Sequence, residues 1–501
     1  MMSRVLRVLV VVTIAIGAMV VPGLHLSGQM PVRAPRYAIT NARIVTAAGA
    51  PIEKGTVVMR DGIIEEVGAS ASAPADALVV DGTGLVVYPG LIDMANSTIV
   101  EGGAPAPAGG GAAATAQAGR GRGTTVATPD NITWADQERE ARTRYLHPDV
   151  DAAKIVEYDG DDLRRLAAAG VTSALAVPAQ GIIRGQSALV NITAPPDPAE
   201  TSALATYRRG SVVVRSGVAQ HVVFATGRGG GGGEGGGGGY PGALLGVIAF
   251  ARQSFLDAQW QKDAKAFAER HKDAAAGSFE PVLDALAPTL DRRMPVAFDA
   301  SEEREIVRAL AFAKEFNLDP IIVGGAEAAN VIDELKAAKA RVIVSANFQA
   351  AGGGGRFGGG GRGGGENDTP IRVTRMRQNA AKVPAALDKA GIPFAFTVGG
   401  LQNPAEFVRA VARTVKEGGL TEDAAIKALT ANAAKLAGAG DRLGTIEKGK
   451  MANVIVTEGN LLDSPRIRHV FVAGWPVDLD VPVQGLSGRG GRGSERPIPN
   501  H

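Results

Sequence analysis

Short apolar runs typical of β-strands alternate with amphipathic helical segments through the middle of the chain, and this alternation constrains the fold more than any other feature. A helix is expected over 161–169, ends at Gly170, and leads into a strand over 171–177. Strands that alternate with helices favour βα units, with right-handed crossovers, and hence a parallel βα barrel of the α/β class. The other strands are expected at 211–214, 222–225, 295–298, 320–323, 341–345 and 393–398.

Helices are expected between these strands. One begins near Pro241, one covers 327–337, one covers 383–389, and one starts after Asn403-Pro404. Ser301 is expected to cap another helix, because a serine side chain accepts hydrogen bonds from the first backbone amides and the acids that follow it suit the helix dipole.

The two ends of the chain have a different pattern. Short β-prone runs between 37 and 88 are separated by Asp61-Gly62 and Asp81-Gly82, and such pairs predict tight hairpin turns. These N-terminal runs are too few to complete a sheet, and the apolar runs at 452–457 and 467–472 can supply the missing strands. We therefore expect both ends to build one composite β-sandwich around an inserted central barrel.

Two segments carry a resemblance to a known family. The run V-Y-P-G-L-I-D-M-A-N-S over 87–97 resembles the start of the barrel in the amidohydrolase superfamily. The segment from Thr430 to Val456, which includes T-A-N-A-A-K-L-A-G and D-R-L-G-T-I-E-K-G-K-M-A-N-V-I-V, resembles the C-terminal signature of the same superfamily, most like its imidazolonepropionase branch. The resemblance implies a TIM-like (β/α)8 barrel over 89–440, inserted into a sandwich made of 36–88 and 441–480. It also implies hydrolysis of non-peptide C–N bonds with zinc or another divalent metal.

The metal-ligand positions of that family hold other residues here. The family, by resemblance, uses a His-x-His pair after the first strand, often a carboxylated lysine, histidines after the fifth and sixth strands, and an aspartate after the eighth. No lysine occurs between Lys154 and Lys262, so the middle strands cannot supply the lysine. At the remaining positions the sequence has Ala95 and Ser97, Asp299, Gly324 or Gly325, and Gly399. We therefore predict no metal site and no cofactor.

The histidines leave few alternatives. Of the six, His25, His469 and His501 lie in the leader, the terminal sheet and the last position. His147 precedes a proline in a loop, and His271 ends a charged helix. His221, in the run H-V-V-F-A, either reaches the barrel mouth or packs at its wall. Asp299 and His221 are thus weak candidates for catalytic residues, and together they are too few for a site with three or four protein ligands.

Other catalytic motifs are missing or have a structural explanation. A Ser-His-Asp triad lacks its G-x-S-x-G element, and 186–188 is interpreted as a loop that enters a strand. The acid pairs at 161–162 and 302–303 fall at helix starts, where the helix dipole accounts for them. The glycine runs lack the Lys-Ser/Thr of a phosphate-binding loop.

Composition limits the partners. The formal net charge is +2 and cysteine is absent, which excludes disulfides, thiolate ligands and a cysteine nucleophile. Three glycine-rich segments at 102–123, 227–239 and 352–365 and a tail at 481–501 are expected to be disordered. Their arginines resemble nucleic-acid-binding segments, but the near-neutral balance favours solvated linkers, so we expect no nucleic-acid partner.

The first thirty residues have the pattern of an export signal. Arg4 and Arg7 precede an apolar run over 8–21, which is shorter than the roughly 20 residues of a membrane span. We expect a cleaved signal peptide over 1–30 and a bacterial periplasmic or secreted protein. No A-x-A cleavage site follows, so an uncleaved anchor, and with it a membrane association, stays open.

Three hypotheses on function follow. The first is an exported, catalytically degenerate amidohydrolase-superfamily protein that acts as a partner of an active paralogue, as a homo-oligomer, or as a binding subunit. The second is an active C–N hydrolase on amide or cyclic imide substrates, with a site rebuilt around Asp299 and His221. The third is a periplasmic ligand-binding protein that uses the barrel mouth. Whether the chain is an enzyme is left open by the sequence.

Overall fold

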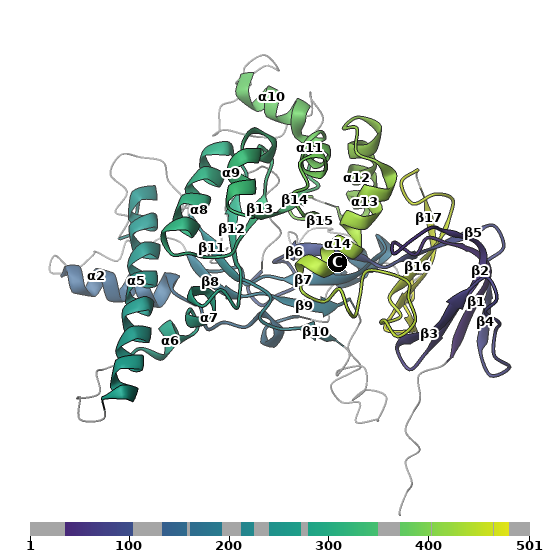
Figure 1. The fold of residues 1–501 in the computed structure, drawn as a ribbon, viewed down its shortest axis with the longest axis horizontal. Coiled ribbons are helices and arrows are strands. Elements are labelled where there is room, and N and C mark those ends of the chain that lie inside the picture. Colours follow the sequence, from purple (N-terminus) through teal and green to yellow (C-terminus); the bar gives the residue numbers. More distant parts are fainter. Residues whose placement is uncertain are drawn as a thin grey trace, which may run out of the picture.

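The computed structural model has an α/β fold with three sheets, and helices lie against the central strands (Figure 1). It describes residues 36–103, 133–157, 161–192, 212–224, 240–271, 279–348, 371–401, 403–463 and 465–479. The expected signal peptide, tail and long glycine-rich loops lie almost wholly outside these ranges. Within them, no helix combines the length and the apolar character needed to cross a membrane.

Strands from both ends of the chain share the largest sheet. Its order is β18-β17-β16-β5-β1-β2-β3, with β4 paired to β1. The central contact between the two ends is antiparallel pairing of β5 with β16, from Pro89 opposite Val454 to Leu85 opposite Glu458. Its strands are β1 (Tyr37–Ile44), β2 (Ile52–Arg60), β3 (Ile63–Gly68), β4 (Leu78–Asp81), β5 (Leu85–Pro89), β16 (Val454–Glu458), β17 (Arg466–Val472) and β18 (Trp475–Pro476).

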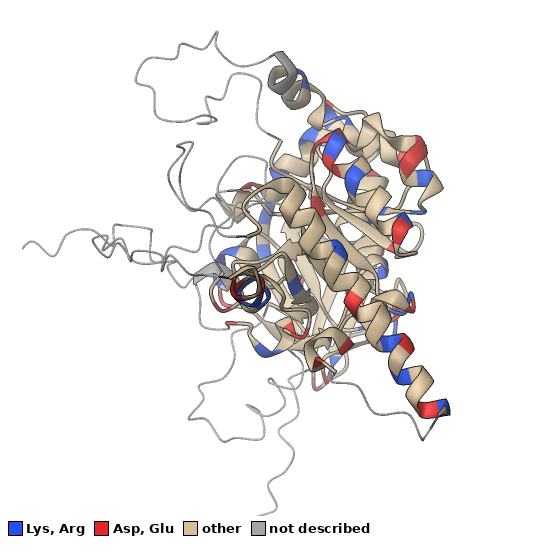
Figure 2. Cartoon of the chain, turned by 90° about the vertical axis from the view of Figure 1, so that its left-hand side faces the viewer, with Lys and Arg blue, Asp and Glu red and all other residues tan. Residues whose placement is uncertain are grey.

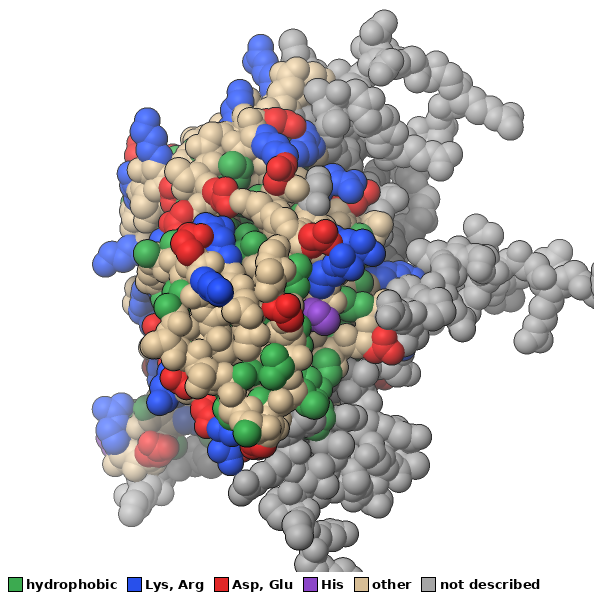
Figure 3. Space-filling view, turned by 90° about the vertical axis from the view of Figure 1, so that its right-hand side faces the viewer, with side chains coloured by type: hydrophobic (Ala, Val, Ile, Leu, Met, Phe, Trp, Pro, Cys, Tyr) green, Lys and Arg blue, Asp and Glu red, His purple; other side chains and the backbone are tan. Residues whose placement is uncertain are grey.

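Of the two predicted Asp-Gly hairpin turns, the one between β2 and β3 forms, whereas the one at Asp81-Gly82 was wrong, because β4 and β5 on either side of it both pair in parallel with β1. Asp61 and Gly62 both have positive φ, at 50° and 82°, as a type I′ turn requires. Figure 3 views the molecule from the side of this sheet, where side chains of both charges and apolar side chains are interspersed over the described surface.

The central strands form two further sheets. One has the order β10-β9-β7-β6, and the other has the order β15-β14-β13-β12-β11-β8. Strands β11 to β15 pair in parallel with one another, as predicted. The strands are β6 (Leu91–Asn96), β7 (Val171–Ala176), β8 (Ile183–Gln186), β9 (Ala188–Asn191), β10 (Val213–Arg215), β11 (Gln220–Val223), β12 (Val296–Ala300), β13 (Pro320–Gly324), β14 (Arg341–Ser345) and β15 (Phe394–Thr397).

One segment differs from the expected all-parallel arrangement. Strands β8 and β9 are separated only by Ser187, and together they run antiparallel to β11 on one side and β7 on the other. Ser187 keeps the backbone bonded between them, since its N–H donates to Ala219 O at 2.9 Å and its carbonyl accepts from Val218 N at 2.8 Å. The interpretation of 186–188 as a loop entering a strand was therefore wrong. This extended segment links the two central sheets.

The helices cover the outer side of the central strands (Figure 1). Phe298, Phe312 and Phe396 belong to the core between strands and helices, whereas Ile92, Ala297 and Ile321 belong to a second core on the opposite face of the strands. The α-helices are α2 (Trp134–Tyr145), α3 (Asp161–Ala168), α5 (Leu244–Arg270), α6 (Pro281–Asp284), α7 (Ala287–Leu290), α8 (Glu303–Glu315), α9 (Ile332–Ala337), α10 (Ile371–Ala380), α11 (Val383–Lys389), α12 (Phe407–Lys416), α13 (Glu422–Leu429) and α14 (Ala431–Leu436).

The start of α8 corrects the predicted cap. Glu302 rather than Ser301 is the N-cap, in a capping box with Glu305. The Glu305 carboxylate accepts from Glu302 N at 3.1 Å and also from Ser301 N at 2.9 Å. The Glu303 amide, which a Ser301 cap would have bonded, donates instead to Glu327 Oε2 at 2.8 Å.

A buried asparagine joins the terminal sheet to the central strands. The Asn453 side chain donates to Ser173 Oγ at 3.0 Å and to Asn191 Oδ1 at 2.8 Å, and it accepts from Ala473 N at 2.7 Å. Ser173 and Asn191 also bond each other at 3.1 Å. These bonds fix β16 against β7 and β9.

We predict that Asn453→Ala lowers the free energy of unfolding by about 2–4 kcal/mol. The alanine leaves buried polar atoms of Ser173, Asn191 and Ala473 without one bond each, and each loss costs on the order of 1 kcal/mol or more. Urea unfolding measures the change, with exposed Asn330→Ala as the matched control, expected within about 0.5 kcal/mol of wild type. A cost as small as that of the control would contradict the assigned role.

Candidate functional site

The first and last central strands meet at a buried carboxylate. Asp93 on β6 accepts hydrogen bonds from Thr397 Oγ1 at 2.7 Å, Val398 N at 3.0 Å and Asn96 Nδ2 at 2.8 Å. Burial raises the pKa of the Asp93 carboxyl, and these donors oppose the shift. No backbone ladder connects β15 to β6 among the described residues, so bonds made by the side chains of Asp93 and Thr397 join the two strands.

The carboxyl ends of the strands carry the positions at which the sequence predicted vacant metal ligands. Ala95 lies on β6 with its carbonyl bonded to Thr397 Oγ1 at 2.8 Å, and Ser97 follows the strand. Gly399 follows β15, and its carbonyl accepts from Ser345 Oγ at 2.6 Å. The backbone at these positions is therefore engaged in local bonds, and no side chain there is an imidazole or a carboxylate.

The two glycines at the end of β13 are required by their surroundings. Gly324 and Gly325 have φ of 108° and 57°, in a region that side chains with a Cβ rarely adopt. A Cβ on Gly324 would lie 2.3 Å from Ser301 Oγ, and one on Gly325 would lie 2.7 Å from Val342 Cγ1. A histidine at either position would require the end of this strand to rearrange.

Asp299 is engaged in an ion pair. It lies on β12 and accepts from Arg184 Nη1 on β8 at 2.8 Å, with both side chains largely buried. Burial raises the pKa of the Asp299 carboxyl, and the Arg184 guanidinium opposes that shift. The Nε of Arg184 is buried and has no hydrogen-bond partner, so the guanidinium keeps an unused donor.

His221 lies deeper in the strands than Asp299. On the paired strands β11 and β12, His221 is opposite Ala297 and Val223 is opposite Asp299. Ala297 belongs to the inner core, so His221 faces the same side. The residue is 1% exposed, and neither ring nitrogen has a hydrogen-bond partner. Burial and the charge of Arg184 lower the pKa of His221 to about 3.

These residues do not fit the divalent metal that the resemblance implies. A catalytic zinc needs three or four imidazole or carboxylate ligands with an open position. Within the described ranges, no three His, Cys, Asp or Glu side chains come close enough to hold an ion. Of the two candidates named from the sequence, Asp299 is paired with Arg184, and His221 is one inward-facing position lower on the neighbouring strand, with no bond between them.

Sequence reasoning missed Arg184. The signal was present, because an arginine directly after Ile182 and Ile183 in an apolar run is rarely buried without an acidic partner. The partner could not be identified from the sequence, since no strand was expected over 183–186.

The pKa of His221 leads to a prediction on acid stability. Because the folded pKa of about 3 lies below the ordinary value of 6.5, protons bind the unfolded chain more strongly, and stability falls as pH falls from about 6.5 toward 3. We expect His221→Leu to remove about 2 kcal/mol of the loss that wild type shows between pH 7 and pH 5. Urea unfolding at pH 7, 6 and 5 measures the two curves. Parallel curves for wild type and variant would refute the assignment.

Similar proteins support the fold and the family. Residues 255–479 match the model of the amidohydrolase family. The structure is similar to an amidohydrolase from Thermotoga maritima MSB8, with a TM-score of 0.64 and 21% identity over 88% of this chain and 99% of that one. At this identity the likeness shows the fold. No curated protein matches the sequence.

More distant similarities have lower scores. Molinate hydrolase matches with a TM-score of 0.48 and 16% identity over 91% of this chain and 97% of that one. A zinc-bound adenosine deaminase from Xanthomonas campestris matches with a TM-score of 0.44 and 15% identity over 88% and 92% of the two chains. Residues 255–479 of this chain thus match the amidohydrolase family, and the structure has the fold of a solved amidohydrolase.

Proposed function

We propose that this protein is a catalytically degenerate member of the amidohydrolase superfamily that acts as a binding or partner subunit. The observation that carries the proposal is the lack of metal-binding side chains at the carboxyl ends of the central strands. Ala95, Ser97 and Gly399 offer no ligand atoms of the usual kind, and the φ of 108° at Gly324 disfavours any residue with a side chain. The one carboxylate at an expected ligand position, Asp299, is neutralised by Arg184.

The scaffold that we propose is a closed barrel. Asp93 bridges β6 to β15, and the antiparallel segment of β8 and β9 links β7 to β11. These two junctions support a ring in which eight strand positions follow one another, with one strand reversed. The terminal sheet would form the separate domain of 36–88 and 441–480, with the barrel over 89–440.

Export and partnership complete the proposal. The leader pattern over 1–30 supports a periplasmic or secreted protein, and the absence of cysteine from the chain suits either location. An active paralogue with an intact His-x-His pair is the proposed partner. If such a protein is encoded beside this one, its purification should bring this chain with it.

The alternative is a working hydrolase in which Asp299 and His221 act as acid, base or ligands of a weakly held metal. Two observations oppose it. His221 has no partner and a pKa far below neutrality, so it stays uncharged, and Asp299 is already bonded to a guanidinium. A general base must lie within hydrogen-bond reach of its substrate and needs a pKa near the working pH.

Metal retention tests the proposal. We expect untagged protein, incubated with zinc and dialysed, to retain less than about a tenth of an equivalent, because fewer than three protein ligands meet at the strand ends. Elemental analysis measures the content, and Asp299→Asn is the matched variant, expected to retain as little as wild type.

Activity assays on amide and cyclic imide substrates complete this test. Near-stoichiometric zinc in the wild type would overturn the proposal. A measured hydrolysis that Asp299→Asn abolishes would also overturn it, in favour of the rebuilt enzyme.

A further inference from the structure

Helix α5 presents an apolar stripe to solvent. It covers 27 residues from Leu244 to Arg270, and its inner face, which includes Phe250, Phe255 and Ala258, is buried in the body of the protein. On the opposite face Leu245 is 81% exposed and Trp260 is 62% exposed, and Leu256 and Phe267 are also exposed. In Figure 2, where the left-hand side of Figure 1 faces the viewer, α5 lies on the near surface and its C-terminal end extends past the rest of the described fold.

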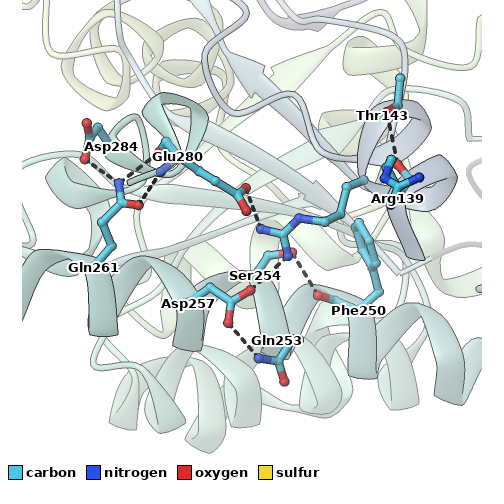
Figure 4. Close-up of polar contacts among 10 residues, drawn as sticks. Arg139, Thr143, Phe250, Gln253, Ser254, Asp257, Gln261, Glu280 and Asp284 are labelled. Atoms are coloured by element: carbon cyan, nitrogen blue, oxygen red, sulfur yellow. Dashed lines mark hydrogen bonds and ion pairs between the residues drawn. The ribbon is translucent and has the colours of Figure 1, made fainter. Parts of the chain in front are cut away.

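Polar contacts fix the rotation of α5 (Figure 4). The Gln261 side chain donates to Glu280 O at 2.9 Å and to Asp284 Oδ1 at 2.8 Å. Arg142 on α2 bonds Asp257 at 2.9 Å and Glu280 at 2.7 Å. Because these contacts all hold the inner flank of the helix, the stripe stays directed outward.

The stripe follows a repeat of eleven residues. Leu245, Leu256 and Phe267 are each eleven apart, as are Ala249 and Trp260. An eleven-residue repeat corresponds to 3.67 residues per turn, close to the 3.6 of a straight helix. The exposed apolar side chains therefore stay close to one face along α5, with a drift of only about 20° per repeat on a straight helix.

We propose that this stripe, defined by Leu245, Ala249, Leu256, Trp260 and Phe267, is the interface with a second copy of the same chain. The two α5 helices would cross antiparallel about a two-fold axis near Ala258. This proposal does not depend on the proposed function, because the stripe lies on an outer helix and the strand ends play no part in it.

The sequence of the stripe is complementary to itself in this arrangement. Each residue meets the partner residue at the same distance on the other side of position 258, so Leu256 faces Trp260. Small Ala249 faces large Phe267 by the same symmetry. A parallel arrangement would instead place each side chain opposite its own copy, with bulky Trp260 against Trp260.

Charge gives an independent argument. Arg252 and Asp263 interrupt the stripe, and their positions lie on opposite sides of the proposed axis at nearly equal distances. Arg252 also pairs with Glu315 of its own chain at 2.7 Å, so an Asp263 of the other copy would join an existing ion pair. In the antiparallel pair, each Arg252 lies near an Asp263 of the other copy. In a parallel pair, Arg252 would face Arg252 and Asp263 would face Asp263, which costs free energy through repulsion.

The size of the contact limits its strength. A helix of this length is roughly 40 Å long, so one stripe covers less than the about 800 Å² per partner of a standard interface. We therefore expect a reversible dimer with a Kd on the order of 10 μM.

The first test compares matched variants of the full chain. Sedimentation velocity over rising protein concentration should show a monomer–dimer equilibrium in wild type that Trp260→Glu shifts to monomer, with at least a tenfold weaker association. The matched control is Val307→Glu on α8, which makes the same kind of change at an apolar side chain that is 42% exposed. It should associate like wild type. Leu256→Glu is the second variant, in case Trp260→Glu fails to fold by circular dichroism.

Three outcomes would overturn the proposal. Wild type could stay monomeric at about 100 μM, well above the expected Kd. Both stripe variants could dimerise like wild type, so that another surface is used. Finally, the full chain could be monomeric and dimerise only when residues 8–21 are removed. This result would show that the apolar run of its own chain, rather than a second copy, covers α5.

The second test uses the absence of cysteine to determine the orientation. Arg252→Cys and Asp263→Cys each provide the only thiol of their chain. Because a disulfide needs Cα atoms within about 7 Å, a mixture of the two variants should cross-link mainly as a heterodimer under mild oxidation. Preferential homodimers of each variant would indicate a parallel pair and refute the arrangement.

Discussion

A single buried carboxylate governs how the central strands meet. Asp93 lies on the first of these strands and accepts bonds from Thr397 and Val398 at the end of the last one. A buried charge without donors is costly, so the ends of β6 and β15 must stay together to satisfy it. Thr397 then also bonds the carbonyl of Ala95, and this fixes the backbone where the superfamily resemblance places a metal-binding pair.

The same local bonding explains why single substitutions at the strand ends cannot restore a metal site. Restoring histidines at 95 and 97 would add imidazoles, but Gly324 is bordered by Ser301 and has a φ that excludes most side chains. The backbone at Gly399 bonds Ser345. Both the side chains at the ligand positions and the backbone that would support them therefore differ from the family's metal-binding pattern. A single substitution does not convert the strand ends of this chain into a metal site.

The sequence predicted those features that depend on local patterns. The Asp61-Gly62 turn, the strand after Gly170 and the parallel run from β11 to β15 all have signals within a few residues. Features that depend on pairing between distant residues were missed. The reversal of β8 and β9 and the Arg184–Asp299 pair both require knowledge of which strands are neighbours. His221 was found as a candidate, but its burial without a partner is a property of packing and has no local signature.

The shared terminal sheet has a consequence for the order of folding. Strand β5 pairs with β16, with Pro89 opposite Val454. This pairing cannot form until Val454 has been synthesised, near the end of translation. Contacts of such long sequence separation form late, because the entropy of closing the loop is lost before they stabilise anything. Until then β5 has an unpaired edge that other chains can join. A ribosome-bound or truncated chain that lacks β16 would thus be prone to aggregation, however stable the finished protein is.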